Sequence, residues 1–341
     1  MIKSVLAIYT ELLGNDKKMA LSHEAEKAYK KAKKQKKKQQ RGHWLLIQKG
    51  DGAKETVSKI FTQLCLVVLI GCIAILANEL RLSVSAKLLN SSVKDIYNSF
   101  INQISPGDNG GNLLPGAEQL VAMNGDTVGW VQIDGTNIAL PVVQRKGSGG
   151  NEYYLNRSFD GSKNKAGTIF LDMRATLNAK ERSDNLVLYG HNQKDKTMFG
   201  DLAKYKNDID FYKSHPTVTF SSNYRTDTYK IIACFVTPVE TWQTADGVVF
   251  DYHNYIDFGS KKRFNSFVDN AALRSQIVTG VDVEYGDKFL TLSTCSNEFE
   301  PSRFVVIARQ TRKGEDPYVD TSLAYVNKSA KEPDWDVIYK R

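Results

Sequence analysis

The sequence predicts a mainly β protein with helical additions, in which an eight-stranded β-barrel follows an N-terminal helix and a transmembrane anchor. The first observation is a series of eight short apolar runs separated by Gly, Asn and Asp turns, at 129–133, 138–143, 167–172, 185–190, 217–220, 228–237, 288–294 and 303–310. Such a series is typical of a closed or nearly closed barrel. The other two observations are an uncharged apolar segment from Ile60 to Asn78 and a helical apolar stripe within 82–104, both before the first run.

Composition supports a folded protein with an unusual N-terminus. Of the 341 residues, 25% are charged and 41% hydrophobic, which excludes a largely disordered, collagenous or multi-span membrane chain. Four cysteines in this length exclude a small disulfide-stapled scaffold. The net charge is +8, but residues 1–59 alone carry +9, so 60–341 has a charge of −1. The basic character therefore belongs to an arm, and no nucleic-acid partner is expected.

The uncharged segment 60–78 has the length of a membrane span. Its 19 residues extend about 28 Å as a helix, close to a hydrocarbon core of about 30 Å. A buried core helix is the alternative, but no polar stripe is present. The lysine-rich arm precedes the span, so the arm is expected in the cytoplasm and 80–341 outside. A cleaved signal peptide usually has a much shorter basic region, which favours a retained anchor in the cell membrane.

Five segments are expected along the chain. They are a basic cytoplasmic arm (1–59), a transmembrane helix (60–78), an extracytoplasmic helix and linker (79–119), the barrel (120–312) and a polar C-terminal tail (313–341). The helical stripe consists of Leu89, Val93, Ile96, Phe100 and Ile104. Shorter helices are expected at 198–213 and around 260–278, where Phe264, Phe267, Val268, Ala271 and Leu273 share a face.

Three polar residues stand at the ends of predicted strands. Cys295 ends the run TLSTC, His191 follows the run NLVLYG, and Arg303 begins the next strand eight residues after Cys295. A thiol nucleophile reacts as the thiolate, which an imidazole can generate and a guanidinium can stabilise. A guanidinium there could also bind a developing oxyanion. These residues are therefore candidates for one catalytic site.

The same residues also have explanations without catalysis. Cys234 lies mid-strand among apolar neighbours and is expected to be a buried, inert thiol. Outside the cytoplasm it could instead form a disulfide with Cys295. An isolated Arg303 could form a surface ion pair with Glu298 or Glu300.

Other classes of site have little support. The sequence contains no GxSxG or GxxxxGK[ST] motif, and GSGG at 147–150 lacks the spacing of a dinucleotide fingerprint. His215 and His253 are expected at the surface, and no histidine or cysteine has metal-ligand spacing. Neither a cofactor nor a metal is expected.

Together, these features resemble the sortases, a family of cell-surface cysteine transpeptidases of Gram-positive bacteria. The resemblance rests on the single anchor, the exterior barrel, LYGHN (188–192) and TLSTC (291–295) followed by Arg303. GWVQIDGTNIALPVVQ (129–144), NEYYLNRSFDG (151–161) and YGHNQKDKTMFGDLAKY (189–205) are similar to class B members. Class C members typically carry a second, C-terminal span, which this sequence lacks.

The resemblance implies cleavage of a C-terminal sorting signal of the LPxTG or NPxTN type at the Thr–Gly or Thr–Asn bond. Cys295 would form a thioacyl intermediate, His191 would act as general acid and base, and Arg303 would orient the signal and stabilise the oxyanion. The acyl group would pass to an amine of the peptidoglycan cross-bridge or of its lipid-linked precursor. The partners implied are secreted proteins that carry the signal.

The resemblance also implies substrate-binding positions at Asn151, Leu155, Tyr189 and Ser293. Two alternatives to transpeptidation remain. One is a thiol endopeptidase that only hydrolyses, and the other is a non-enzymatic wall-binding β-domain stapled through Cys234 and Cys295.

Overall fold

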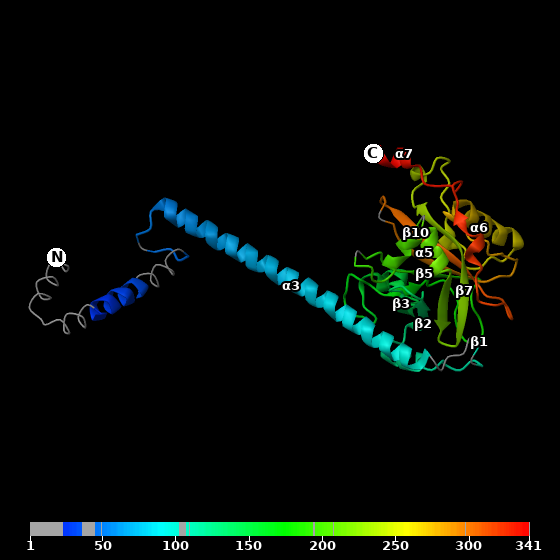
Figure 1. Ribbon diagram of the computed structural model, residues 1–341, viewed down its shortest axis with the longest axis horizontal. Helices are drawn as coiled ribbons and strands as arrows, with labels where there is room; N and C mark the ends of the chain where they lie inside the picture. The colour runs from blue at the N-terminus through cyan, green and yellow to red at the C-terminus, as the bar shows by residue number, and fades with distance from the viewer. Residues whose placement is uncertain are drawn as a thin grey trace, which may run out of the picture. The chain divides into compact units, whose positions relative to one another are not determined.

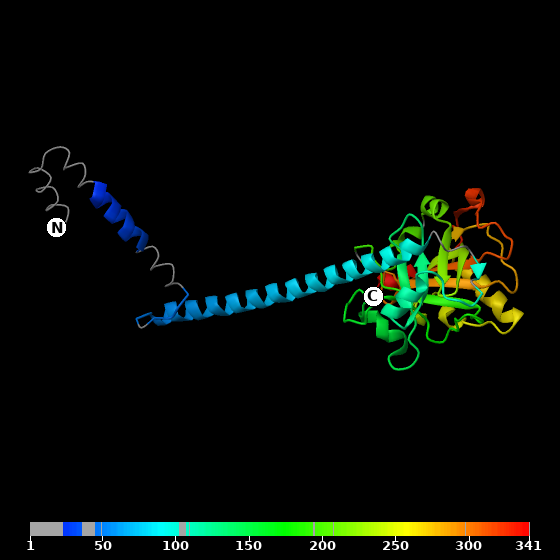
Figure 2. The same ribbon diagram turned by 90° about the horizontal axis from the view of Figure 1, so that it is seen from below.

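The computed structural model describes residues 23–35, 45–48, 50–101, 107–108, 110–193, 195–206, 208–296 and 298–340. The chain forms two compact units, Met1–Leu80 and Arg81–Arg341. In the first unit, residues 23–35 are helical, whereas Lys36, Lys37, Lys38 and Arg41 of the predicted arm lie outside the described residues. The second unit holds the β-barrel (Figures 1 and 2).

Helix α3 (Ala53–Ile101) contains the predicted span 60–78 and continues into the predicted stripe. Its part Ala53–Ser99 is long and apolar enough to cross a membrane, and the most apolar stretch is not buried against protein. α3 is therefore a candidate membrane anchor. Ile104 of the predicted stripe and the side chain of Phe100 lie outside the described residues.

Eight strands close into a barrel, which confirms the predicted fold class. They are β2 (Thr127–Gln132), β3 (Ala139–Val143), β4 (Ile169–Leu171), β5 (Asn185–Tyr189), β6 (Thr217–Ser222), β7 (Arg225–Pro238), β9 (Phe289–Cys295) and β10 (Ser302–Gln310). Their order is β7–β10–β9–β5–β4–β3–β2–β6, and β6 pairs with β7 to close the ring. The pairs β3–β4 and β5–β9 are parallel. Each predicted run coincides with one strand.

The runs are continuous rather than alternating because several strands are buried on both faces. Every residue of β3 is buried, and in β9 only the last residue, Cys295, is exposed. Strands covered on both sides lose the polar–apolar alternation of a half-exposed sheet. The one exposed position of β9 is therefore a thiol at the strand end.

Short helices and strands precede, connect and follow the barrel strands. These elements are β1 (Gly107–Asp108), α4 (Ala117–Met123), η1 (Gly150–Asn156), η2 (Gly200–Tyr205), α5 (Ile209–Ser214), η3 (Thr241–Gln243), η4 (Tyr252–Asn254), α6 (Lys261–Arg274), β8 (Ile277–Val278), η5 (Thr321–Leu323), β11 (Tyr325–Val326) and α7 (Trp335–Tyr339). The predicted helix at 198–213 is divided into η2 and α5, and the helix predicted around 260–278 ends at Arg274. α6 buries Phe264, Phe267 and Ala271 as expected, but Leu273 of the predicted face is 50% exposed.

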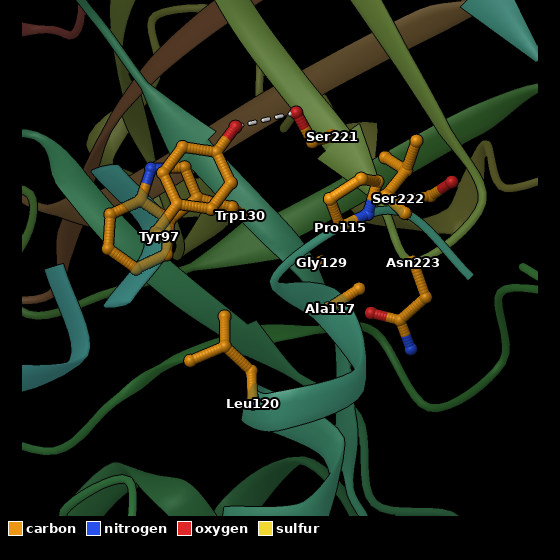
Figure 3. A pocket seen from close by; sticks show the side chains of 10 residues that line it. Tyr97, Pro115, Ala117, Leu120, Gly129, Trp130, Ser221, Ser222 and Asn223 are labelled. Atoms are coloured by element: carbon orange, nitrogen blue, oxygen red, sulfur yellow. Dashed lines mark hydrogen bonds between the residues drawn. The ribbon is translucent and has the colours of Figure 1, made fainter. Parts of the chain in front are cut away.

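The end of α3 packs on the barrel through an aromatic pair (Figure 3). Tyr97 stacks on Trp130 of β2, with ring centroids 4.3 Å apart and planes 10° from parallel. The Tyr97 hydroxyl is 2.8 Å from the Ser221 hydroxyl of β6. Val93, one turn earlier, is fully buried. Two neighbouring strands of the barrel thus hold this end of the helix.

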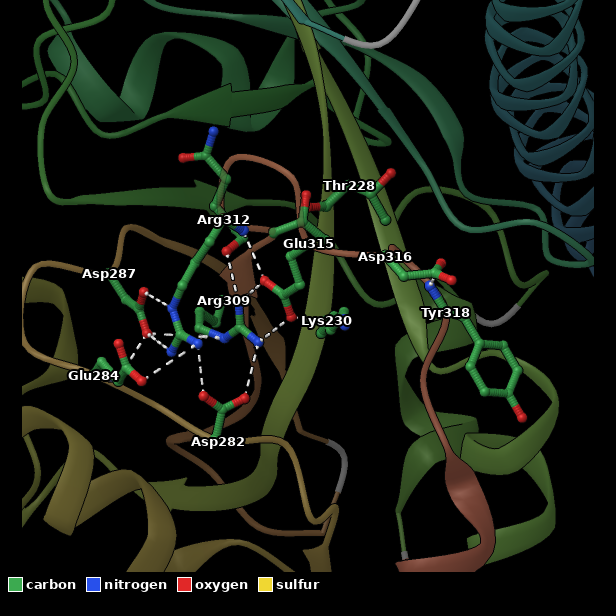
Figure 4. A network of polar contacts seen from close by, with 12 residues as sticks. Thr228, Lys230, Asp282, Glu284, Asp287, Arg309, Arg312, Glu315, Asp316 and Tyr318 are labelled. Atoms are coloured by element: carbon green, nitrogen blue, oxygen red, sulfur yellow. Dashed lines mark hydrogen bonds and ion pairs between the residues drawn. The ribbon is translucent and has the colours of Figure 1, made fainter.

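A cluster of ion pairs fixes the chain just after β10 (Figure 4). Arg309 is fully buried and contacts Glu315 at 2.6 Å, while Lys230 of β7 contacts the same carboxylate at 2.7 Å. Arg312 contacts Asp282 at 2.6 Å and Asp287 at 2.8 Å. The hydrogen bonds from Arg309 hold the pKa of Glu315 well below its usual range. The predicted polar tail therefore begins as an anchored segment.

Candidate active site

Three neighbouring strands bring the predicted catalytic residues together. Cys295 ends β9, and Arg303 of the antiparallel β10 is its direct partner in the ladder. On the other side, the parallel strand β5 pairs Tyr189 with Ser293, and the amide of Gly190 donates to the Ser293 carbonyl at 3.1 Å. Continuing this register by two residues places His191 beside Cys295. Cys295, His191 and Arg303 all line one cavity, so the thiol, the imidazole and the guanidinium face a common space.

The imidazole of His191 is held by a backbone carbonyl. Its Nε2 atom is 2.7 Å from the carbonyl oxygen of Leu155 in η1. A carbonyl oxygen can only accept, so Nε2 carries the hydrogen and Nδ1 is the atom that can exchange a proton. The amide of Phe199 donates to the His191 carbonyl at 3.0 Å, which fixes the backbone as well.

Gly167 allows this arrangement around His191. Its φ is +67°, in the left-handed region. A Cβ atom here would lie 2.7 Å from the Leu155 oxygen and 3.1 Å from Cδ2 of His191. Only a glycine lets the backbone just before β4 lie this close to both the Leu155 carbonyl and the His191 ring.

The loop between Cys295 and Arg303 is tied to its surroundings. The side-chain amide of Asn192 donates to the Cys295 carbonyl at 3.0 Å. The Arg303 guanidinium donates to the Ser302 carbonyl at 3.0 Å. Glu298, considered above as a surface partner of Arg303, instead forms an ion pair with Lys206.

A cavity of about 250 Å³ opens at this rim of the barrel. Its lining includes all seven residues predicted for the site, namely Asn151, Leu155, Tyr189, His191, Ser293, Cys295 and Arg303. It also includes the exposed Glu152, which was not predicted as a site residue although it lies in the NEYYL stretch beside Asn151. The residues predicted for the site therefore line a single cavity.

Behind the thiol, Ser293 is held by a residue that was not predicted. The hydroxyls of Tyr252 and Ser293 are 2.6 Å apart, and both residues are buried. Burial raises the pKa of Tyr252, which keeps it a neutral hydrogen-bonding group. Tyr252 lies 41 residues away in sequence, in a loop without a recognisable pattern, so only the fold reveals it.

A second polar group fixes the side wall of the cavity. The Tyr189 hydroxyl donates to Asp172 at 2.9 Å, and Arg174 donates to both oxygens of the same carboxylate. Burial by itself raises the pKa of Asp172, but the bonds from Arg174 outweigh it and the net pKa is lowered. Burial, followed by the charge of Asp172, raises the pKa of Tyr189. The Asn151 side-chain oxygen accepts from the amide of Met173 at 2.7 Å, which orients its amide group.

Cys234, His215 and His253 do not line the cavity. Cys234 and Cys295 are both free thiols, so the disulfide considered above, and a domain stapled by it, are wrong. Cys234 is fully buried, and burial raises its pKa to about 12, as expected for an inert thiol. His215 and His253 are half-buried rather than surface residues. His215 stacks on Phe211 at 4.3 Å between ring centroids.

Metal ligands do not cluster in the described part of the chain. Within these residues, no group of three or more His, Cys, Asp or Glu side chains is placed to hold a metal ion.

Comparison with known proteins gives the family. The model of the sortase domain matches residues 131–311. Sortase B of Listeria monocytogenes is 33% identical over 196 residues, which cover 57% of this chain and 73% of that protein. Sortase B of Staphylococcus aureus is 32% identical over 202 residues, covering 58% and 75%. A solved Staphylococcus aureus sortase B–substrate complex superposes with a TM-score of 0.57 at 27% identity, covering 67% of this chain and 98% of that one. The chain belongs to the sortase family and resembles its class B members over nearly the whole barrel.

Proposed function

We propose that this chain is a membrane-anchored class B sortase that cleaves a C-terminal sorting signal of secreted proteins and transfers the acyl fragment to a cell-wall amine. The signal is of the LPxTG or NPxTN type, cut after its threonine. The observation that carries the proposal is the placement of Cys295 between the strands of His191 and Arg303, in a cavity open to solvent.

In the first half-reaction, Nδ1 of His191 takes the proton of the Cys295 thiol, and the resulting thiolate attacks the carbonyl carbon of the Thr–Gly or Thr–Asn bond. The carbon–sulfur bond forms and the carbon–nitrogen bond breaks, and the leaving amine takes a proton from Nδ1 of His191. Nε2 stays bonded to the Leu155 carbonyl throughout, so the ring keeps its orientation while Nδ1 transfers the proton.

The Arg303 guanidinium supports the charge that develops during this step. Its planar group has five N–H donors, and one is used by the Ser302 carbonyl. Arg303 lies on the strand next to that of Cys295, and its remaining N–H donors can bind the oxyanion or a carbonyl of the signal. Asn151, Leu155, Tyr189 and Ser293 form the wall against which the signal peptide lies.

In the second half-reaction, an amine nitrogen attacks the thioester carbon. His191 accepts the proton from the amine, the new carbon–nitrogen bond forms and the Cys295 thiolate leaves. We assign the acceptor to the peptidoglycan cross-bridge or its lipid-linked precursor. α3 anchors the enzyme at the membrane where both substrates emerge, with the basic arm in the cytoplasm.

The proposal is tested by product analysis with the full-length chain in detergent. The wild-type chain is expected to cleave at least one peptide of an LPxTG-like and NPxTN-like panel. Cys295→Ala should lower this activity by more than about 10³-fold because the nucleophile is gone. Cys234→Ala, which removes the buried thiol of the barrel, is the matched control and should retain activity.

Adding an amine separates transfer from hydrolysis. Hydroxylamine should divert the product from the free acid to the hydroxamate, since both compete for one thioester. A product that stays entirely the acid at every amine concentration would instead establish the hydrolytic endopeptidase.

A further inference from the structure

The segment after β10 lies outside the match to the sortase domain, which ends at residue 311. It nevertheless stays on the barrel as far as α7, the last helix (Figure 1). The sequence predicts a polar tail at 313–341 because the composition of this segment is polar and mixed. The structure shows what these residues contact.

Ion pairs, a short strand pairing and backbone hydrogen bonds hold this segment at several points. The ion pairs of Figure 4 fix its beginning at Glu315, and β11 pairs with β8 further on. The amide of Asn327 donates to the Gln276 carbonyl at 2.8 Å, and the amide of Lys331 donates to the Leu273 carbonyl at 2.8 Å. The amide of Asp334 donates to the Gln243 carbonyl at 2.9 Å. Most of these bonds use the backbone, so they leave little trace in the sequence.

The segment ends against the loop that joins the two catalytic strands. Trp335 of α7 contacts Phe299 edge to face, with ring centroids 5.5 Å apart and planes at 84°. Phe299 belongs to the loop between Cys295 and Arg303 and is only 9% exposed. Trp335 is itself partly buried against the main apolar core. The pair of rings therefore connects the C-terminal helix to the catalytic loop.

The backbone carbonyl of Phe299 is hydrogen-bonded to the point where the loop re-enters the barrel. This carbonyl accepts a hydrogen bond from the Ser302 hydroxyl, and the same hydroxyl donates to the Ser296 carbonyl at 3.3 Å. The amide of Ser296 donates to the Ser302 carbonyl at 3.1 Å. These bonds lie directly beyond the Cys295–Arg303 pair, which is the last pair of the β9–β10 ladder. Terminal pairs open most easily, so anchoring the loop keeps thiol and guanidinium in register.

We propose that the C-terminal segment is a positioning element for the reaction, and that Trp335 acts through Phe299 to keep Cys295 and Arg303 aligned. This role rests on the proposed transpeptidase function. Trp335 does not line the cavity, so its effect falls on the alignment of reacting groups rather than on binding of the signal peptide.

The test compares variants of the full-length chain in detergent with a quenched sorting-signal peptide that the wild-type chain cleaves. Trp335→Ala should lower kcat about tenfold, with KM changed less than about twofold, because misalignment affects the transition state more than binding. Trp335→Phe keeps a ring against Phe299 and should restore most of kcat. Tyr318→Ala is the matched control, since this aromatic residue of the same segment is 71% exposed.

Hydrogen exchange provides a readout that needs no turnover. In Trp335→Ala, amides of the peptide covering 294–304 should exchange faster, while those of β2 and β3 stay as in the wild type. If Trp335→Ala does not fold, Trp335→Leu takes its place in both measurements. Unchanged kcat and unchanged exchange in the folded variant would overturn the positioning role. A wild-type chain that cleaves no signal peptide would overturn the proposed function, and the exchange result would still decide whether Trp335 holds the loop.

Discussion

His191 depends on a backbone oxygen rather than on a third catalytic side chain. The Leu155 carbonyl holds Nε2 at 2.7 Å, and Gly167 leaves the space in which ring and carbonyl meet. A leucine that was predicted as a wall of the substrate site therefore also orients the imidazole. Sequence reasoning could not find this second role because a backbone carbonyl has no sequence signal.

Gly167→Ala tests the importance of this space. The new Cβ would lie 2.7 Å from the Leu155 oxygen, so carbonyl and ring must move apart. We expect kcat to fall about 10- to 100-fold, with a smaller change in KM, because a misplaced general acid acts mainly on the transition state. Steady-state kinetics on a cleaved signal peptide measures both constants.

Gly161→Ala is the control for backbone strain alone. Gly161 also has a left-handed φ, +79°, but its Cβ would meet only the Tyr153 hydroxyl, at 3.8 Å. Equal losses of kcat in both variants would contradict the role given to Gly167.

Among single residues, those at strand ends could be predicted and those that support them could not. Cys295, His191 and Arg303 each follow or begin a clear apolar run, so adjacent strands were enough to bring them together. Tyr252 and Glu152 reach the site from η4 and η1, short elements of irregular backbone. Their position depends on long-range folding that no local pattern records.

At the scale of elements, the barrel strands were predictable because strands that are buried on both faces have continuous apolar runs in the sequence. The two-residue strands β1, β8 and β11 were not predicted, since two residues cannot show a period. Tyr97 was missed for a different reason. Its hydroxyl makes it look polar in the α3 stripe, yet it is only 4% exposed. Its ring stacks on Trp130, and its hydroxyl is hydrogen-bonded to the Ser221 hydroxyl.

The ion cluster after β10 makes a prediction at this scale. Glu315→Gln removes the carboxylate that faces the fully buried Arg309, so the free energy of unfolding should fall by about 2–4 kcal/mol at pH 7. The control is Glu284→Gln, whose carboxylate is 71% exposed and 3.8 Å from Arg312, and which should cost less than about 1 kcal/mol. Urea unfolding measures both.

The same variant has a defined pH dependence. Arg309 lowers the pKa of Glu315 in the folded state. The ionised Glu315 therefore contributes fully to the free energy of unfolding above its pKa in the unfolded chain, about 4.3. This contribution is lost as the pH falls toward the lower pKa of the folded state. The difference between wild type and Glu315→Gln should therefore shrink by about 2 kcal/mol between pH 7 and pH 3. A difference that stays constant over this range would contradict the ion-pair account.

At the scale of the whole molecule, charge and apolar character are divided along the chain. Residues 1–59 have a net charge of +9 and residues 60–341 a net charge of −1. The barrel unit Arg81–Arg341 contains the site. This division was readable from sequence because a lysine run and an uncharged segment are local features. The course of the C-terminal segment was not, because backbone hydrogen bonds fix most of it.

The central claim is that the Cys295 sulfur becomes acylated by the signal peptide. Intact-mass measurement of the full-length chain, mixed with a cleaved peptide in the absence of added amine, tests this most directly. We expect a transient mass increase equal to the peptide fragment up to threonine, located on Cys295 by fragmentation and removed by hydroxylamine. Cleavage that proceeds without any such adduct, or an adduct on another residue, would contradict the account.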